Sequence, residues 1–113
     1  MDTVEQYRKI VQQVLQPFTQ RWYSGLNVTN EALFDEKNDH YAILSVGWEG
    51  DIRRVHHTLM HLDIIGGKVW IQRDGTEDGI ADALEAAGIP KQAIVLAFHR
   101  AADRALLPEY AVA

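Results

Sequence analysis

A pair of consecutive glycines between two β-rich segments constrains the fold of this chain more than any other feature. Residues 52–65 are rich in β-branched and aliphatic side chains, and residues 68–73 resume this pattern after Gly66 and Gly67. A two-residue loop in which both positions favour positive φ is typical of a tight β-hairpin turn. The sequence therefore predicts an antiparallel hairpin, against which the remaining elements must pack.

The segments around this hairpin predict a domain of mixed helices and strands. Apolar residues recur every three or four positions from Val4 onwards, which predicts an amphipathic helix capped by Thr3 and stopped or kinked at Pro17. A second helix is expected to begin at Thr76 and to end at Gly88. Strands are predicted at residues 32–35, 41–48, 52–65, 68–73 and 94–98, with a loop at 23–30. The order α-β-β-β-β-α-β predicts an α+β fold, with a mainly antiparallel sheet of about five strands and both helices packed on one face.

The composition narrows the possible functions. With 113 residues, the chain is expected to form a single domain over residues 1–113. Eleven basic and sixteen acidic residues give a net charge of −5, which disfavours unaided binding to nucleic acid because phosphates attract Lys and Arg. The absence of cysteine excludes disulfides and thiolate metal sites. No segment has the pattern of a membrane helix or an export signal, so we expect a cytoplasmic protein.

Alternation within the strands sorts the side chains onto two predicted faces of the sheet. The set expected to face the helices is Ala42, Leu44, Val46, Trp48, Thr58, Met60, Leu62, Ile64, Val69 and Ile71. The opposite set is Tyr41, Ile43, Ser45, His57, Leu59, His61, Asp63, Trp70, Gln72 and Asp74. Aromatic and aliphatic side chains of this kind are typical of protein interfaces rather than of a solvated face. The sequence therefore predicts a homodimer, a larger homo-oligomer or a complex with a different protein; the alternative is that the tail or the 23–30 loop covers this face.

The residues predicted to contact the partner are Tyr41, Ile43, Leu59, His61 and Trp70. They combine large apolar side chains with an imidazole, and they come from three predicted strands. Truncating such residues is expected to weaken assembly without unfolding the chain.

A metal-dependent enzyme is a second hypothesis. His57, His61 and Asp63 share one side of a predicted strand, and imidazole and carboxylate are groups that ligate zinc or non-haem iron. Asp74 would lie at the end of the following strand. Two-residue spacings of this kind also arise by chance on polar strand faces. We therefore predict that the protein binds no metal and no cofactor. The alternative is a metal-dependent enzyme that uses His57, His61 and Asp63.

The segment after the fourth predicted strand also contains acidic residues next to a helix start. A helix N-terminus can bind an anion, but Glu77 and Asp78 would repel a phosphate there. The structural interpretation is that Gly75 makes the turn and Thr76 caps the helix. The chain has neither the Gly-x-Ser-x-Gly motif of hydrolases nor a phosphate-binding glycine loop, so no catalytic residues are predicted.

Motifs along nearly the whole chain resemble one family. They are Glu5-Gln6-Tyr7-Arg8, Val46-Gly47-Trp48, His61-Leu62-Asp63-Ile64, Gly67-Lys68-Val69-Trp70-Ile71-Gln72, Asp74-Gly75-Thr76-Glu77, Gly79-Ile80-Ala81 and Gly88-Ile89-Pro90-Lys91. On these motifs the sequence is similar to the XisI family, the fdxN element excision controlling factors of cyanobacteria. It departs from the family pattern at Gly66, at Pro17 and in the Ala-rich residues 100–107.

This resemblance implies a non-enzymatic accessory protein that acts through protein–protein contacts. Its expected partners are a XisH-like nuclease-fold protein and a XisF-like site-specific recombinase, in a system that excises a DNA element during heterocyst differentiation. An alternative implied by the same resemblance is the antitoxin-like half of a XisH–XisI two-component module. The family supplies no catalytic residues that could be assigned to this chain.

Overall fold

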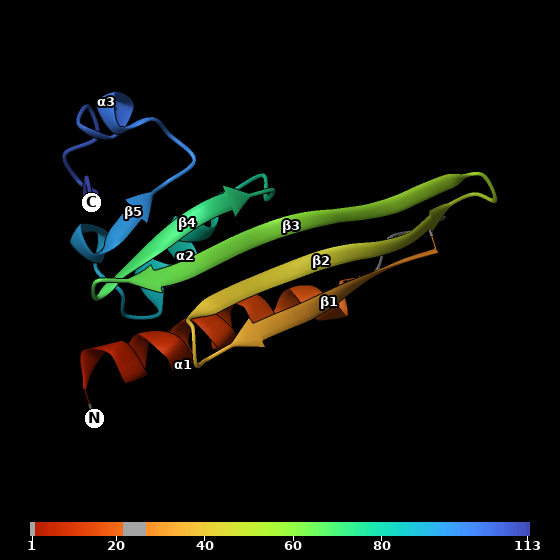
Figure 1. Ribbon diagram of the computed structural model, residues 1–113, viewed down its shortest axis with the longest axis horizontal. Helices are drawn as coiled ribbons and strands as arrows, with labels where there is room; N and C mark the ends of the chain where they lie inside the picture. The colour runs from red at the N-terminus through yellow and green to blue at the C-terminus, as the bar shows by residue number, and fades with distance from the viewer. Residues whose placement is uncertain (1, 22–26) are drawn as a thin grey trace.

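Five strands form one sheet in which each strand lies beside the next in sequence (Figure 1). The structure is a computed structural model that describes residues 2–21 and 27–113. The strands are β1 (Asn27–Asp35), β2 (His40–Glu49), β3 (Arg53–Ile65), β4 (Lys68–Asp74) and β5 (Ile94–Leu96). Strands β1 to β4 pair antiparallel and β5 joins β4 in parallel. The predicted α+β fold with a mainly antiparallel sheet is therefore confirmed.

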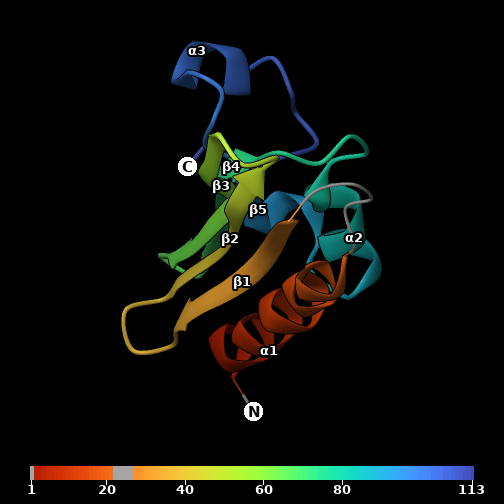
Figure 2. The same cartoon turned by 90° about the vertical axis from the view of Figure 1, so that its right-hand side faces the viewer.

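The two longer helices lie on the same side of the sheet (Figure 2). The helical segments are α1 (Thr3–Leu15), η1 (Gln16–Gln20), α2 (Ile80–Ala86), η2 (Lys91–Ala93) and α3 (Ala101–Arg104). The core between helices and sheet consists of Tyr7, Val11, Leu15, Tyr41, Ile43, Met60, Leu62, Ile64, Val69, Ile71, Ile80, Leu84, Ile89, Ile94 and Leu96. Among the described residues, no helix is both long and apolar enough to cross a membrane.

Local signals in the sequence correctly predicted where several elements turn or end. Gly66 and Gly67 have φ of 58° and 77°, as a two-residue hairpin turn requires. The α-helical geometry of α1 ends before Pro17 and continues as the 3-10 helix η1. Gly88 has a φ of 119°, and the amide of Ile89 donates to the Leu84 carbonyl to close the end of α2.

Both predicted helix caps are wrong, by one residue for α1 and by three for α2. The cap of α1 is Asp2, whose carboxylate accepts a hydrogen bond from the Glu5 amide at 2.9 Å, and Thr3 is the first helical residue. Helix α2 begins at Ile80, so Thr76 lies before it. A carboxylate accepts such bonds as well as a hydroxyl does, and this explains how Asp2 takes the role assigned to Thr3.

The turn between β4 and α2 has a structural role, as predicted, but Asp74 performs it. One carboxylate oxygen of Asp74 accepts hydrogen bonds from the amide and the hydroxyl of Thr76. The other accepts the Ile80 amide, the first of α2, at 2.7 Å. The Thr76 hydroxyl in turn accepts the Gly79 amide at 3.1 Å. The Asp74 carboxylate therefore holds this turn by accepting hydrogen bonds from its backbone amides.

Two strand boundaries differ from the prediction by more than one residue. The predicted loop at 23–30 is partly strand, because residues 27–30 pair with residues 45–48 of β2; residues 22–26 lie outside the described residues. Strand β5 ends at Leu96 instead of residue 98. Residues 27–30 contain one apolar residue and so give a weak strand pattern, and pairing with β2 decides their conformation.

The predicted faces of β2 are reversed. Tyr41 and Ile43 are 0% exposed and belong to the core, because they pair with Leu62 and Met60 of β3. Ala42, Leu44, Val46 and Trp48 consequently lie on the face that α1 and α2 leave uncovered. Both sets of alternate residues in β2 are apolar, so the alternation alone did not distinguish them.

A β-bulge in β3 causes the remaining errors. Met60 pairs with Ile43 and Thr58 pairs with Leu44, which leaves Leu59 without a register partner. Leu59 packs against the core, and its carbonyl accepts the Gly75 amide at 2.8 Å. Because the bulge shifts the alternation by one residue, Thr58 moves to the uncovered face, contrary to prediction. His57 moves to the opposite face from His61, also contrary to prediction.

Candidate functional site on the outer face of the sheet

The face of the sheet that α1 and α2 leave uncovered is here called the outer face (Figure 2). Residues that strand pairing places on it include Asn27, Thr29, Glu31, Leu33, Asp35, His40, Ala42, Leu44, Val46, Trp48, Arg54, His56, Thr58, His61, Asp63, Trp70 and Arg73. Leu33 is 56% exposed and Trp48 is 42% exposed, and the guanidinium of Arg54 lies 5.4 Å from the Trp48 ring centre. The outer face therefore carries apolar and aromatic side chains among polar and charged ones, and the predicted set was wrong for Tyr41, Ile43, Ser45, His57 and Leu59, which lie on the other side of the sheet.

The five predicted contact residues are divided between the two sides of the sheet. Tyr41 and Ile43 are buried in the core, and Leu59 packs on the helix side, so these three do not lie on the outer face. His61 and Trp70 do lie on it. A side chain that is fully buried in the folded chain cannot supply contact area to a partner, which corrects the assignment of Tyr41 and Ile43.

The C-terminal tail covers only the β4–β5 end of the outer face. The Arg104 guanidinium lies 5.8 Å from the Trp70 ring centre, and Val95 of β5 is fully buried. Ala111 forms a parallel bridge with Val95, and its amide donates to the Ile94 carbonyl. The alternative that the tail folds over this face is therefore correct for β4 and β5, whereas none of the described segments covers it over β1 and β2 (Figures 1 and 2).

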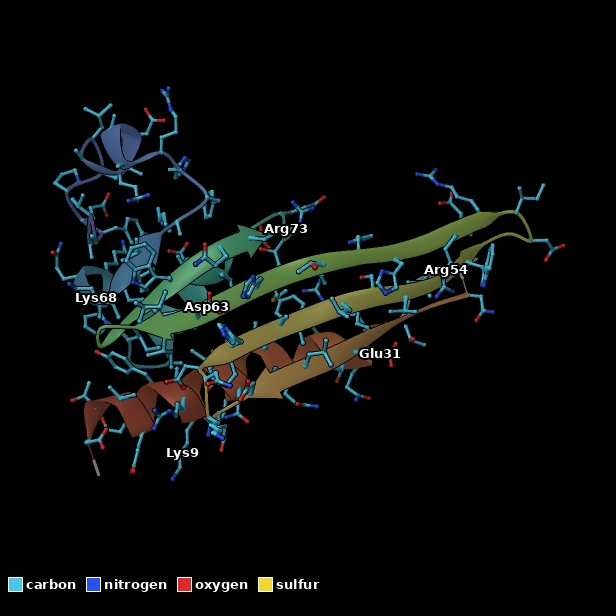
Figure 3. All side chains as sticks on the ribbon, in the orientation of Figure 1. Lys9, Glu31, Arg54, Asp63, Lys68 and Arg73 are labelled. Atoms are coloured by element: carbon cyan, nitrogen blue, oxygen red, sulfur yellow. The ribbon has the colours of Figure 1, made fainter. Side chains whose placement is uncertain are left out.

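A polar cluster lies on the outer face, built by His40, His61 and Asp63. The same Asp63 oxygen, Oδ1, is 2.7 Å from His40 Nδ1 and 2.8 Å from His61 Nε2. Gln72 of β4 donates a hydrogen bond to the other oxygen, Oδ2, at 3.3 Å. Figure 3 looks onto this face, with Asp63 labelled on β3. Asp63 is only 7% exposed, so this cluster supplies the polar partners of a nearly buried carboxylate.

Strand register explains how the cluster forms. His40 is the first residue of β2 and is the register partner of Asp63, while His61 precedes Asp63 by two residues on the same strand face. The hydrogen bond from His40 to Asp63, together with the negative charge of Asp63, raises the pKa of His40. The cluster therefore places a proton-accepting imidazole at the surface beside a nearly buried carboxylate.

This cluster replaces the predicted metal-binding set. His57 is on the opposite face because of the bulge at Leu59, and Asp74 is bonded to the turn before α2. In residues 2–21 and 27–113, the one group of His, Cys, Asp or Glu side chains close enough to share a metal ion is His40, His61 and Asp63. Sequence analysis missed His40, because its proximity to Asp63 depends on the pairing of two strands.

A second polar network joins the β1–β2 turn to α1. Arg8 donates to both oxygens of Asp39, from Nε at 2.7 Å and from Nη2 at 3.1 Å, and the Tyr41 hydroxyl donates to Asp39 at 2.9 Å. The hydrogen bonds from Arg8 lower the pKa of Asp39, while burial and the bond to Asp39 raise the pKa of Tyr41. This network fixes the position of the Tyr41 hydroxyl and is not part of the outer face.

Together, the fold and the outer face define a small α+β protein with one helix-covered and one largely open sheet face. The family model described as "XisI protein" matches residues 1–112. The chain therefore belongs to the XisI family, and the resemblance inferred from the sequence motifs is confirmed.

Two crystal structures from Anabaena variabilis share this fold. The fdxN element excision controlling factor XisI has 34% sequence identity and a TM-score of 0.81, with 99% of this chain and 100% of that chain covered. A XisI-like protein has 29% identity and a TM-score of 0.87, with 97% and 99% covered. A search of curated proteins gave no significant match.

Proposed function

We propose that this protein is a non-enzymatic regulatory factor in the site-specific excision of a DNA element, acting through protein contacts made by its outer face. The similarity over the whole chain to a factor named for control of fdxN element excision supports the proposed process. The open part of the outer face, on β1 and β2, is the observation that carries the proposed mechanism.

The largest apolar side chains of this surface are Leu33, Leu44 and Trp48. Leu33 and Trp48 are among the exposed large apolar residues, and Leu44 lies between them on the same face. Exposed aromatic and aliphatic groups on one face favour burial against another protein, since this removes apolar area from water. The net charge of −5 favours a protein partner over DNA. His61 and Trp70 border this surface and remain proposed contacts.

The proposed occupant of the outer face is a XisH-like nuclease-fold protein, with a XisF-like recombinase in the same assembly. Because the proposed process acts on chromosomal DNA, the cytoplasm is the proposed location of this activity. A second copy of this chain is the competing occupant, and the experiment below distinguishes the two.

The experiment compares capture of a co-expressed XisH-like protein by the wild type and by Leu33→Asp and Trp48→Ser variants. We expect binding to weaken by about ten-fold or more in each variant, because interface side chains of this kind carry much of the binding free energy. The matched control is Ile52→Asp, since Ile52 is 93% exposed and lies at the β2–β3 turn. Capture by the wild type is expected to equal that by the control.

Two results would contradict the proposal. Equal capture by all four proteins would show that the outer face is not the interface. A wild-type homodimer that is lost in both variants, without capture of the XisH-like protein, would identify a second copy as the occupant. Sedimentation of each protein alone supplies this second measurement.

A further inference from the structure

We propose that His40, His61 and Asp63 bind one Zn²⁺ ion on the outer face of the sheet. The three residues come from neighbouring positions of β2 and β3, so the sheet itself sets their separation. This inference is independent of the proposed partner, because the site is built from one chain.

The donor atoms are close to the positions that zinc requires. One imidazole nitrogen of each histidine and one oxygen of Asp63 all lie within 4.8 Å of one another. Zinc bonds of about 2.0–2.2 Å in a tetrahedral arrangement separate neighbouring ligand atoms by roughly 3.3 Å. Zinc binding therefore needs the two nitrogens to move away from Asp63 Oδ1, now at 2.7 and 2.8 Å, and towards each other.

The side chains that must move are the exposed ones. The His40 side chain is 59% exposed and the His61 side chain is 38% exposed, whereas that of Asp63 is 10% exposed. Rotation of the two imidazoles about their side-chain bonds changes few packing contacts. The nearly buried Asp63 side chain on β3 keeps its position, and the two imidazoles move relative to it.

The groups around Asp63 are those expected around a metal ligand rather than those of an ion pair with Lys or Arg. Within residues 2–21 and 27–113, the ion pairs of Asp63 are to the two imidazoles, and none is to a Lys or an Arg. Arg73 pairs with His61 in the strand register, but its Nε donates to the Thr58 carbonyl at 2.7 Å. Asp63 therefore presents its negative charge to two groups that are themselves zinc ligands.

Gln72 supplies the support that a ligating carboxylate usually has. Its amide donates to Asp63 Oδ2, the oxygen that faces neither histidine. Hydrogen bonds to the second oxygen orient a metal-bound carboxylate. Two imidazoles and one carboxylate leave a fourth zinc position, which water would fill.

The test is a calorimetric titration of the untagged, chelator-treated chain with Zn²⁺. We expect one ion per chain, and His40→Gln, His61→Gln and Asp63→Asn variants that each bind at least about ten-fold more weakly. The matched controls are His56→Gln and His57→Gln, which remove an imidazole from the same strand outside the cluster. Both controls are expected to bind as the wild type does.

Cobalt gives a second measurement that does not depend on affinity alone. Co²⁺ in the wild-type site is expected to show the intense visible absorption of four-coordinate cobalt, and this band should be lost in His61→Gln. Absence of stoichiometric zinc binding by the wild type would overturn the proposal. An equal loss of affinity in the His56→Gln or His57→Gln controls would overturn it as well. Circular dichroism of each variant identifies any loss of zinc affinity that is due to unfolding. If the other variants unfold, the result for His40→Gln decides, because the His40 side chain is exposed.

Discussion

Arg8 in α1 donates two hydrogen bonds to Asp39, at 2.7 and 3.1 Å, and thereby joins the first helix to the turn between β1 and β2. The hydroxyl of Tyr41, a fully buried residue, donates to the same carboxylate. Asp39 is therefore the point at which the helix, the turn and the core meet. A bidentate pairing of this kind is geometrically specific as well as charge-assisted.

The first prediction concerns the pH dependence of stability. The pKa of Asp39 is lowered in the folded chain by the bonds from Arg8, with the Tyr41 hydroxyl adding to this and burial opposing it. The contribution of Asp39 is therefore present above its unfolded pKa of about 3.9, and it is lost as pH falls through the lower folded pKa. We expect the stability difference between wild type and Asp39→Asn, from urea unfolding, to be larger at neutral pH than in acid. Asp51→Asn, in the exposed β2–β3 turn, is the control; a difference that does not change with pH would refute the prediction.

The second prediction concerns the close approach of β1 to Gly47. A Cβ atom at this position would lie 2.0 Å from the Asn27 carbonyl oxygen, and the φ of 154° is one that L-residues rarely adopt. We expect Gly47→Ala to reduce the free energy of unfolding by more than about 3 kcal/mol, because the backbone itself must move. Gly50→Ala is the control, since it also has positive φ but no atom within 4 Å, and a loss of about 1 kcal/mol is expected. Equal losses in the two variants would contradict the close approach.

The third prediction tests which face of the sheet is buried. We expect Ile43→Ala to cost about 2–5 kcal/mol of unfolding free energy, because it removes core contacts and leaves a cavity. Leu33→Ala, on the outer face and 56% exposed, is expected to cost less than about 1 kcal/mol. Chemical denaturation of both variants measures the difference. The opposite ranking would mean that the sheet buries its other face.

The fourth prediction concerns the start of α2. Asp74→Ala removes the acceptor of the Ile80 amide and of the Thr76 amide, so we expect a loss of about 1 kcal/mol, as for a helix cap. Faster hydrogen exchange of the Ile80 amide is expected to accompany it. The exposed Asp78 supplies the control, as Asp78→Ala. Unchanged exchange at Ile80 in Asp74→Ala would show that this carboxylate does not order the helix start.

The amino-acid sequence by itself determined the parts of this protein whose physical cause is local. The Gly66-Gly67 turn, the change of helix type at Pro17 and the end of α2 at Gly88 each depend on backbone conformations that one or two residues favour. The order of elements followed from the hydrophobic period of each segment. Family membership also followed, because its motifs are stretches of contiguous sequence.

Only the tertiary structure decided which side chains meet. Both alternate sets of β2 are apolar, so the burial of Tyr41 was decided by its pairing with Leu62. The residues of β3 did not indicate the bulge at Leu59, yet it places His57 and His61 on opposite faces. The second imidazole of the cluster around Asp63 is therefore that of His40. The physical reason is that a strand has a side-chain period of two, so a shift of one residue exchanges its faces. Such a shift is set by hydrogen bonding to another strand rather than by the residues of the strand itself.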